Sequence, residues 1–107
     1  MDRAYLTRLE EKLRSVEHDI ANPQLAANPR QYREVVREHT RLRRIFEQAA
    51  EWERMTRELE ESRQMVAAPG TDPDLRALAR EEAADLERRL PEQERILRRA
   101  MVEPDPN

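Results

Sequence analysis

Residues 29–68 read PRQYREVVREHTRLRRIFEQAAEWERMTRELEESRQMVAA, and they predict one uninterrupted α-helix. After its first position the stretch contains no Pro and no Gly, and its β-branched residues are few, so nothing inside it opposes a helix. Asn28 is a suitable N-cap, and Pro29 takes the first helical position, where its missing N–H is not needed. Pro69 and Gly70 end the helix, which is then about 60 Å long at ~1.5 Å rise per residue.

The apolar residues of this long helix form two stripes on different faces. Both stripes advance largely in steps of three and four residues. The first stripe consists of Tyr32, Val35, His39, Leu42, Phe46 and Ala49. The second stripe consists of Ile45, Ala49, Trp52, Thr56, Leu59 and Val66. A single stripe would bury one neighbour, so two stripes predict that different helices cover the two halves.

One further helix is predicted on each side of the long one. Residues 2–21 carry a heptad seam of Leu6, Leu9, Leu13, Val16 and Ile20. Residues 73–101 carry a seam of Leu75, Ala79, Ala83, Leu86, Leu90, Leu97 and Met101. Because short links make neighbouring helices antiparallel, we predict an all-α fold. It is an elongated, coiled-coil-like antiparallel three-helix bundle that forms one domain over residues 1–104.

The helical pattern is interrupted at two places, at Pro91 and between the first two helices. Pro91 removes a backbone hydrogen bond inside the third helix, which predicts a kink near residues 87–91. The alternative is a full break, with a new helix beginning at Pro91. Between the first two helices, residues 24–27 have room for one helical turn, with Leu25 facing inward.

The composition narrows the class of protein. Of 107 residues, 40% are charged and 37% hydrophobic, which is typical of long helices that pack through narrow seams. Disorder is disfavoured because the apolar residues are periodic. The absence of Cys excludes disulfides and thiol chemistry and fits a reducing cytoplasm. No apolar run approaches the ~20 residues of a membrane span, so we expect a soluble cytoplasmic protein.

The residue pattern does not predict catalytic chemistry. His18 and His39 have no partners at metal-ligand spacing, and the single Gly follows a Pro in a turn rather than in a phosphate-binding loop. The carboxylates are expected on solvated helix surfaces, not in buried pairs. Trp52 is interpreted as a seam residue, with an exposed binding residue as the alternative. We therefore expect no enzyme, no metal and no cofactor.

Charge is distributed unevenly along the long helix. Residues 30–44 hold six Arg, whereas residues 47–61 hold six Glu. Antiparallel folding would bring the end of the third helix beside the basic half and create a positive patch. Its candidate contact residues are Arg41, Arg43, Arg44, Arg95, Arg98 and Arg99. The patch is either a solvated, salt-bridged bundle end or a contact surface for phosphate or an acidic partner. No aromatic residues are interleaved, so sequence-specific RNA reading is not expected.

Three junctions carry a family resemblance. Residues 22–29 (NPQLAANP) form a doubled Asx-Pro link before a long helix, and residues 72–82 (DPDLRALAREE) start a third helix. Residues 105–107 (DPN) close an aliphatic stretch. In this order they resemble the N-terminal domain of bacterial class I peptide chain release factors, and the last junction resembles the type that reads UAA and UAG. Pro91 and residues 102–104 (VEP) depart from the family's pattern.

The resemblance implies a helical domain that docks on the ribosome at the stalk-base region of the large subunit, near the GTPase that recycles the factor. We expect both the Gly-Gly-Gln tripeptide for peptidyl-tRNA hydrolysis and the Pro-x-Thr-type tripeptide for stop-codon reading to be missing from these residues. We therefore expect a linker from residue 105 onward, leading to domains outside this chain. The alternative is a freestanding helical adaptor or coiled-coil protein that dimerises through residues 52–66.

Overall fold

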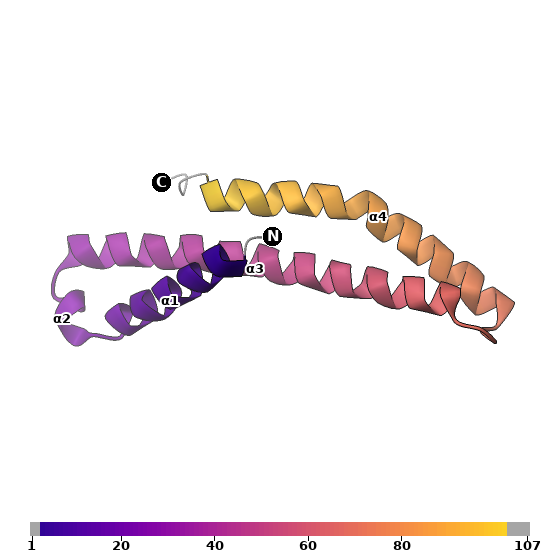
Figure 1. Ribbon diagram of the computed structural model, residues 1–107. Helices are drawn as coiled ribbons and strands as arrows, with labels where there is room; N and C mark the ends of the chain where they lie inside the picture. The colour runs from indigo at the N-terminus through magenta and orange to yellow at the C-terminus, as the bar shows by residue number, and fades with distance from the viewer. Residues whose placement is uncertain (1–2, 103–107) are drawn as a thin grey trace. The chain divides into compact units, whose positions relative to one another are not determined.

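A computed structural model describes residues 3–102, and every regular element in that range is an α-helix (Figure 1). The helices are α1 (Arg3–Ile20), α2 (Pro23–Ala26), α3 (Pro29–Ala67) and α4 (Pro73–Val102). The predicted all-α fold and its long central helix are confirmed. The linker predicted from residue 105 lies outside the described residues. None of the helices within residues 3–102 combines the length and the apolar character that crossing a membrane requires.

The chain divides into two compact units that share α3. The described part of the first unit runs from residue 3 to Phe46 and holds α1, α2 and the first part of α3. The second unit, Glu47–Val102, holds the rest of α3 and α4. Each half of α3 thus has its own partner helix, as the two apolar stripes predicted. The single domain over residues 1–104 stays a prediction.

The first unit buries apolar residues of both α1 and α3. Leu9 and Val16 of the α1 heptad are buried, and Leu42 and Ile45 of α3 have no exposed surface. Full burial of side chains of this size removes each from water and contributes on the order of 2 kcal/mol. The other three heptad residues, Leu6, Leu13 and Ile20, are half-buried, so the heptad residues form the least exposed face of α1.

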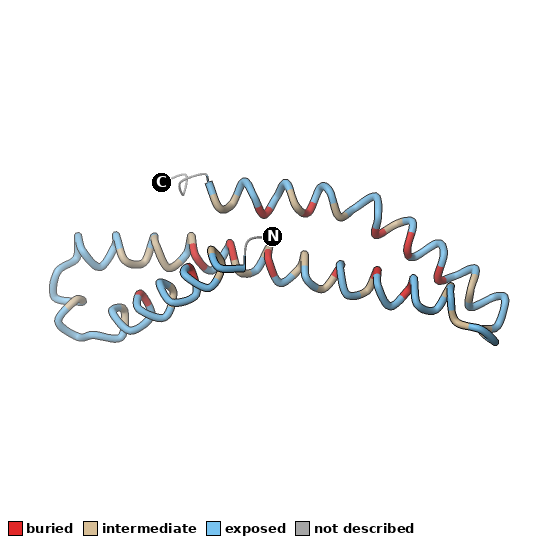
Figure 2. The backbone as a smooth tube through the Cα atoms, viewed as in Figure 1, coloured by how far each residue is buried: buried red, intermediate tan, exposed pale blue. Residues whose placement is uncertain are grey.

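The second unit has its core between α3 and α4. Met55 and Leu59 of α3 form a cluster with Ala83 and Leu86 of α4, and Leu90 packs against it. Figure 2 shows the buried positions of α4 on the side that faces α3. An antiparallel fold at the α3–α4 turn predicts this pairing of Leu86 with Met55.

Polar side chains add specific contacts to the second unit. Gln93 is buried, and its amide Nε2 donates to the backbone oxygen of Gln48 at 3.0 Å and to its Oε1 at 2.9 Å. Because a buried amide without partners is destabilising, this pair favours one register of α4 on α3. Trp52 is half-buried, and its Nε1–H donates to Glu94 Oε1 at 3.3 Å. Trp52 is therefore a seam residue.

The helix ends follow the capping pattern of the sequence. Asn22 Oδ1 accepts from the N–H of Gln24 at 3.0 Å, and Asn28 Oδ1 accepts from the N–H of Gln31 at 3.3 Å. Asp72 caps α4 in the same way, at 2.8 Å from the N–H of Asp74. These oxygens satisfy N–H groups that have no partner within the helix.

Pro91 lies inside α4, which continues through it without a break. The alternative of a new helix beginning at Pro91 is therefore wrong. Figure 1 shows that α4 bends between its ends, as a helix with an interior Pro commonly does. In the link before α3, Leu25 is half-buried in the single turn of α2.

Substitution of two methionines of α3 tests which residues stabilise the second unit. Met55 is 2% exposed, so Met55→Ala should leave a cavity and lower the free energy of unfolding by about 2–3 kcal/mol. Met65 is 46% exposed, and Met65→Ala should cost less than about 0.5 kcal/mol. Urea unfolding followed by circular dichroism measures both. Equal losses would contradict the core assigned to Met55.

Candidate functional site

The six arginines predicted as a contact surface are divided between the two units. Arg41, Arg43 and Arg44 lie on α3 in the first unit. Arg95, Arg98 and Arg99 lie near the end of α4 in the second unit. That all six form one patch stays a prediction, and each set has its own surroundings.

Arg41 is held in a network that joins α1 to α3. Its Nε and Nη2 donate to the two carboxylate oxygens of Glu38 at 3.1 and 3.0 Å. Lys12 Nζ of α1 reaches Glu38 Oε1 at 2.8 Å. The Arg41 hydrogen bonds, assisted by Lys12, lower the pKa of Glu38 from its ordinary 4.5 to about 2. Arg41 is therefore primarily a structural residue, because its guanidinium already has a bidentate partner.

The remaining arginines are exposed. Arg95 Nη2 lies 2.7 Å from Glu92 Oε2, and Arg98 Nη2 lies 3.5 Å from Glu94 Oε2, each within α4. Arg43, Arg44 and Arg99 are also exposed. Exposed pairs three or four residues apart on one helix contribute only a few tenths of a kcal/mol, so a partner can displace them at low cost. These arginines can therefore bind an external anionic group.

His39 bridges the same two helices as the Glu38 network. Its side chain is about a quarter exposed, and Nε2 lies 3.7 Å from Glu17 Oε2 of α1. Within residues 3–102, no group of three or more His, Cys, Asp and Glu side chains has a geometry that could hold a metal ion. The position of His39 fits the packing role that its place in the apolar stripe predicted.

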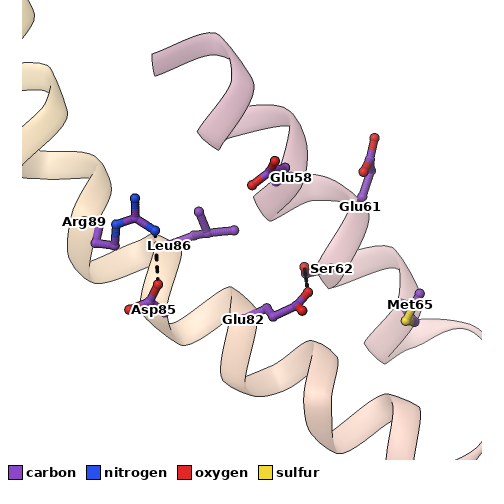
Figure 3. A pocket seen from close by; sticks show the side chains of 8 residues that line it. All are labelled: Glu58, Glu61, Ser62, Met65, Glu82, Asp85, Leu86 and Arg89. Atoms are coloured by element: carbon purple, nitrogen blue, oxygen red, sulfur yellow. Dashed lines mark hydrogen bonds and ion pairs between the residues drawn. The ribbon is translucent and has the colours of Figure 1, made fainter. Parts of the chain in front are cut away.

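A groove of about 460 Å³ lies between α3 and α4 in the second unit. Its lining consists of Glu58, Glu61, Ser62, Met65, Glu82, Asp85, Leu86 and Arg89, and we call it the acidic groove (Figure 3). Figure 3 shows Ser62 and Glu82 pointing toward each other, and the Ser62 hydroxyl donates to Glu82 Oε2 at 3.5 Å.

Asp85 holds the only guanidinium of the acidic groove. Arg89 donates to Asp85 at 3.3 Å and Arg88 at 3.1 Å, and together they lower the pKa of Asp85, Arg89 more strongly. Both arginines therefore pair within α4, although Arg89 also contributes, after Arg54, to lowering the pKa of Glu51 on α3. The partner on their own helix is nearer, since residues three and four apart share one face.

Sequence reasoning did not find the acidic groove. The sequence does indicate the two sides of the groove, because two sets of its lining residues recur at helical spacing. These sets are Glu58, Glu61 and Met65 on α3, and Glu82, Asp85 and Arg89 on α4. Spacing alone does not tell which turn of α4 lies opposite a given turn of α3. Only the packing of the two helices brings the two sets together.

The expectation that a Pro-x-Thr tripeptide is missing is wrong, because Pro69, Gly70 and Thr71 have that pattern. These residues form the turn between α3 and α4. Gly70 has a φ of +80°, a conformation that favours Gly. The Thr71 hydroxyl donates to the backbone oxygens of Met65 and Ala68 at 3.1 and 3.0 Å. Thr71 therefore caps the end of α3, and we assign no codon reading to it.

Comparison with known proteins identifies relatives over almost the whole chain. The model of the PCRF domain family matches residues 9–107. Peptide chain release factor 1 of Syntrophobacter fumaroxidans is 33% identical over 102 residues, which covers 95% of this chain and 28% of the relative. The same-named protein of Symbiobacterium thermophilum is 36% identical over 90 residues, 84% of this chain and 25% of the relative.

A third relative, peptide chain release factor 1 of Chlorobaculum tepidum, is 30% identical over 100 residues, with 94% of this chain and 28% of the relative covered. The chain thus spans less than a third of the length of these relatives. No solved structure matches the chain. The family resemblance seen in the three junctions is confirmed.

The Glu38 network predicts a stability contribution that depends on pH. Because the pKa of Glu38 is lowered on folding, its stabilisation is complete above pH ~4.5 and is lost as pH falls towards 2. Glu38→Gln should lower the free energy of unfolding by about 1–2 kcal/mol at pH 7, and by much less near pH 2. Urea unfolding at both pH values measures the difference.

Glu34→Gln is the matched control for this substitution. Glu34 is on the same helix, is about two-thirds exposed, and has Arg30 at a distance of 3.9 Å. Its loss should cost less than about 0.5 kcal/mol at either pH. Equal effects of the two substitutions, or a Glu38→Gln effect that does not change with pH, would contradict the network's role.

Proposed function

The chain belongs to the PCRF domain family, and on that premise we propose that it acts in translation termination, as a ribosome-docking helical domain of a peptide chain release factor. The match over residues 9–107 carries the proposal, because it includes most of α1 and all of α2, α3 and α4. The three relatives described above all bear the name of peptide chain release factor 1. A freestanding adaptor has no comparable support.

In this proposal, ribosome docking and the chemical reaction of termination belong to different parts of a release factor. Peptidyl-tRNA hydrolysis and reading of UAA and UAG belong, on this view, to parts of a release factor outside residues 1–107. The helical domain contributes affinity and orientation, near the stalk base of the large subunit and close to the recycling GTPase. The place of action is the cytoplasm, where ribosomes translate.

Exposed arginines supply the means of docking. Ribosomal RNA presents a dense array of phosphates, and Arg side chains bind phosphate oxygens without reading sequence. Arg43 and Arg44 are exposed on α3, and Arg99 is exposed on α4. Arg95 and Arg98 can exchange their weak pairs on α4 for phosphate. Arg41 has a structural role instead, since its bidentate partner Glu38 is already in place.

Charge reversal tests this surface. The double substitution Arg43→Glu and Arg44→Glu should weaken binding to purified large ribosomal subunits about tenfold, because phosphate contacts become repulsions. Co-sedimentation at low and moderate salt measures the affinity, and circular dichroism verifies that α3 is intact.

Arg57→Glu with Arg80→Glu is the matched control for charge. Both residues are exposed in the second unit, and the change in net charge is the same. The control variant should retain most of the affinity of the unmodified chain for the large ribosomal subunit. A similar loss in both double variants would remove the arginine surface from the proposal, and no binding by the unmodified chain would overturn ribosome docking itself.

The position on the ribosome can be tested with a single attached probe. The chain has no Cys, so Thr40→Cys on the exposed side of α3 creates a unique labelling position. An iron chelate attached there should cleave large-subunit RNA near the stalk base when hydroxyl radicals are generated. Cleavage confined to other regions of the subunit would contradict docking at the stalk base.

A further inference from the structure

The second unit leaves large apolar side chains exposed beside the acidic groove. Met65 lines the groove and is 46% exposed. Leu75 and Leu78 of α4 are 53% and 51% exposed, so the expectation that Leu75 belongs to the buried seam of this helix is wrong. Leu78 precedes Glu82 by four residues, and Leu75 precedes it by seven, so all three lie on the same face of α4. We call Met65, Leu75 and Leu78 the apolar rim of the groove.

The lining of the groove carries negative charge that its single arginine, Arg89, does not neutralise. Four carboxylates and one guanidinium line it, which gives a formal net charge of −3. Asp85 is paired with Arg88 and Arg89. Glu58 is paired with Arg54 at 2.7 Å.

The two other carboxylates of the groove have no arginine partner. Across residues 3–102, Glu61 makes no ion pair, and Glu82 has the Ser62 hydroxyl as its partner. Glu61 precedes Met65 by four residues, and Glu82 follows Leu78 by four. The unneutralised charge therefore borders the apolar rim on both helices.

We propose that the acidic groove and its apolar rim bind a basic amphipathic helix of a partner protein. A third helix can lie along the groove between two antiparallel helices. Its apolar stripe would cover Met65, Leu75 and Leu78, and its Lys or Arg side chains would pair with Glu61 and Glu82. The paired apolar and charged contacts require a helix that carries both characters on one face.

The negative charge of the groove disfavours two other kinds of binding partner for this face. The carboxylates repel the phosphates of nucleic acid, so RNA is disfavoured here. A second copy of the chain would bring the same negative groove against itself in a symmetric dimer, which places like charges opposite each other. The basic helix is the occupant whose charge complements the surface.

The groove and the exposed arginines proposed for ribosome docking consist of different residues. The groove interaction can therefore fail while ribosome docking holds, and the converse is also true. Reversal of Arg43 and Arg44 should leave the groove interaction unchanged, which allows the two proposals to be separated in one set of variants.

The test uses a labelled synthetic helical peptide of Leu, Lys and Ala. Its Leu residues recur every three or four positions, and Lys residues flank them. Fluorescence anisotropy measures binding to the full chain, and a second peptide with Glu in place of Lys controls for charge. The Lys peptide should bind, and the Glu peptide should bind at least about tenfold more weakly.

Matched variants locate the peptide on the surface. Glu61→Lys with Glu82→Lys should weaken binding about tenfold, whereas Glu60→Lys with Glu81→Lys makes the same net charge change at neighbouring exposed positions and should have little effect. Leu75→Ser with Leu78→Ser should also weaken binding, because it removes the apolar rim.

Several results would overturn the proposal. Equal weakening by the two Lys pairs would show attraction to net charge alone, and an unchanged affinity for the Leu75→Ser, Leu78→Ser variant would exclude the apolar contact. If sedimentation equilibrium instead shows a dimer that this Leu variant abolishes, the face is an interface between copies. Circular dichroism of each variant verifies that α3 and α4 remain helical.

Discussion

Burial of apolar residues along α3 is the constraint on which the rest of the structure depends. A helix of 39 residues has a continuous backbone, but its stability in water comes mainly from covering its apolar face. Leu42 and Ile45 are buried within the first unit, and Met55 and Leu59 within the second. Because the two stripes occupy different faces, one long helix can serve as the scaffold of two compact units.

Most of the ion pairs within residues 3–102 join two side chains of the same helix. Arg54 pairs with Glu51 and Glu58 within α3, and Asp85 pairs with two arginines within α4. Fewer pairs connect helices, such as Arg63 with Glu87 at 3.0 Å. The register of each unit therefore depends chiefly on apolar packing, assisted by a few polar contacts that would be left buried without partners if the helices slid.

Because apolar packing holds the helices together, the exposed charged side chains remain available to bind other molecules. The exposed arginines are the surface that we propose for contact with the phosphates of ribosomal RNA. The acidic groove has the opposite charge and an apolar rim, and it is suited to a basic helix. In both proposals the binding would rest on charge and shape at exposed side chains, so substitutions there could change affinity without altering the buried cores.

The sequence by itself determined the helices, their ends and the faces they bury. These features are local: Asn28 and Asp72 cap their own helices, and apolar residues three and four apart must share a face. Only the tertiary structure decided that α4 continues through Pro91 and that Glu61 and Glu82 line one groove. The spacing of apolar residues shows which face of a helix is buried. It does not show which turn of α4 lies opposite a given turn of α3, because that depends on how the side chains of the two helices fit together.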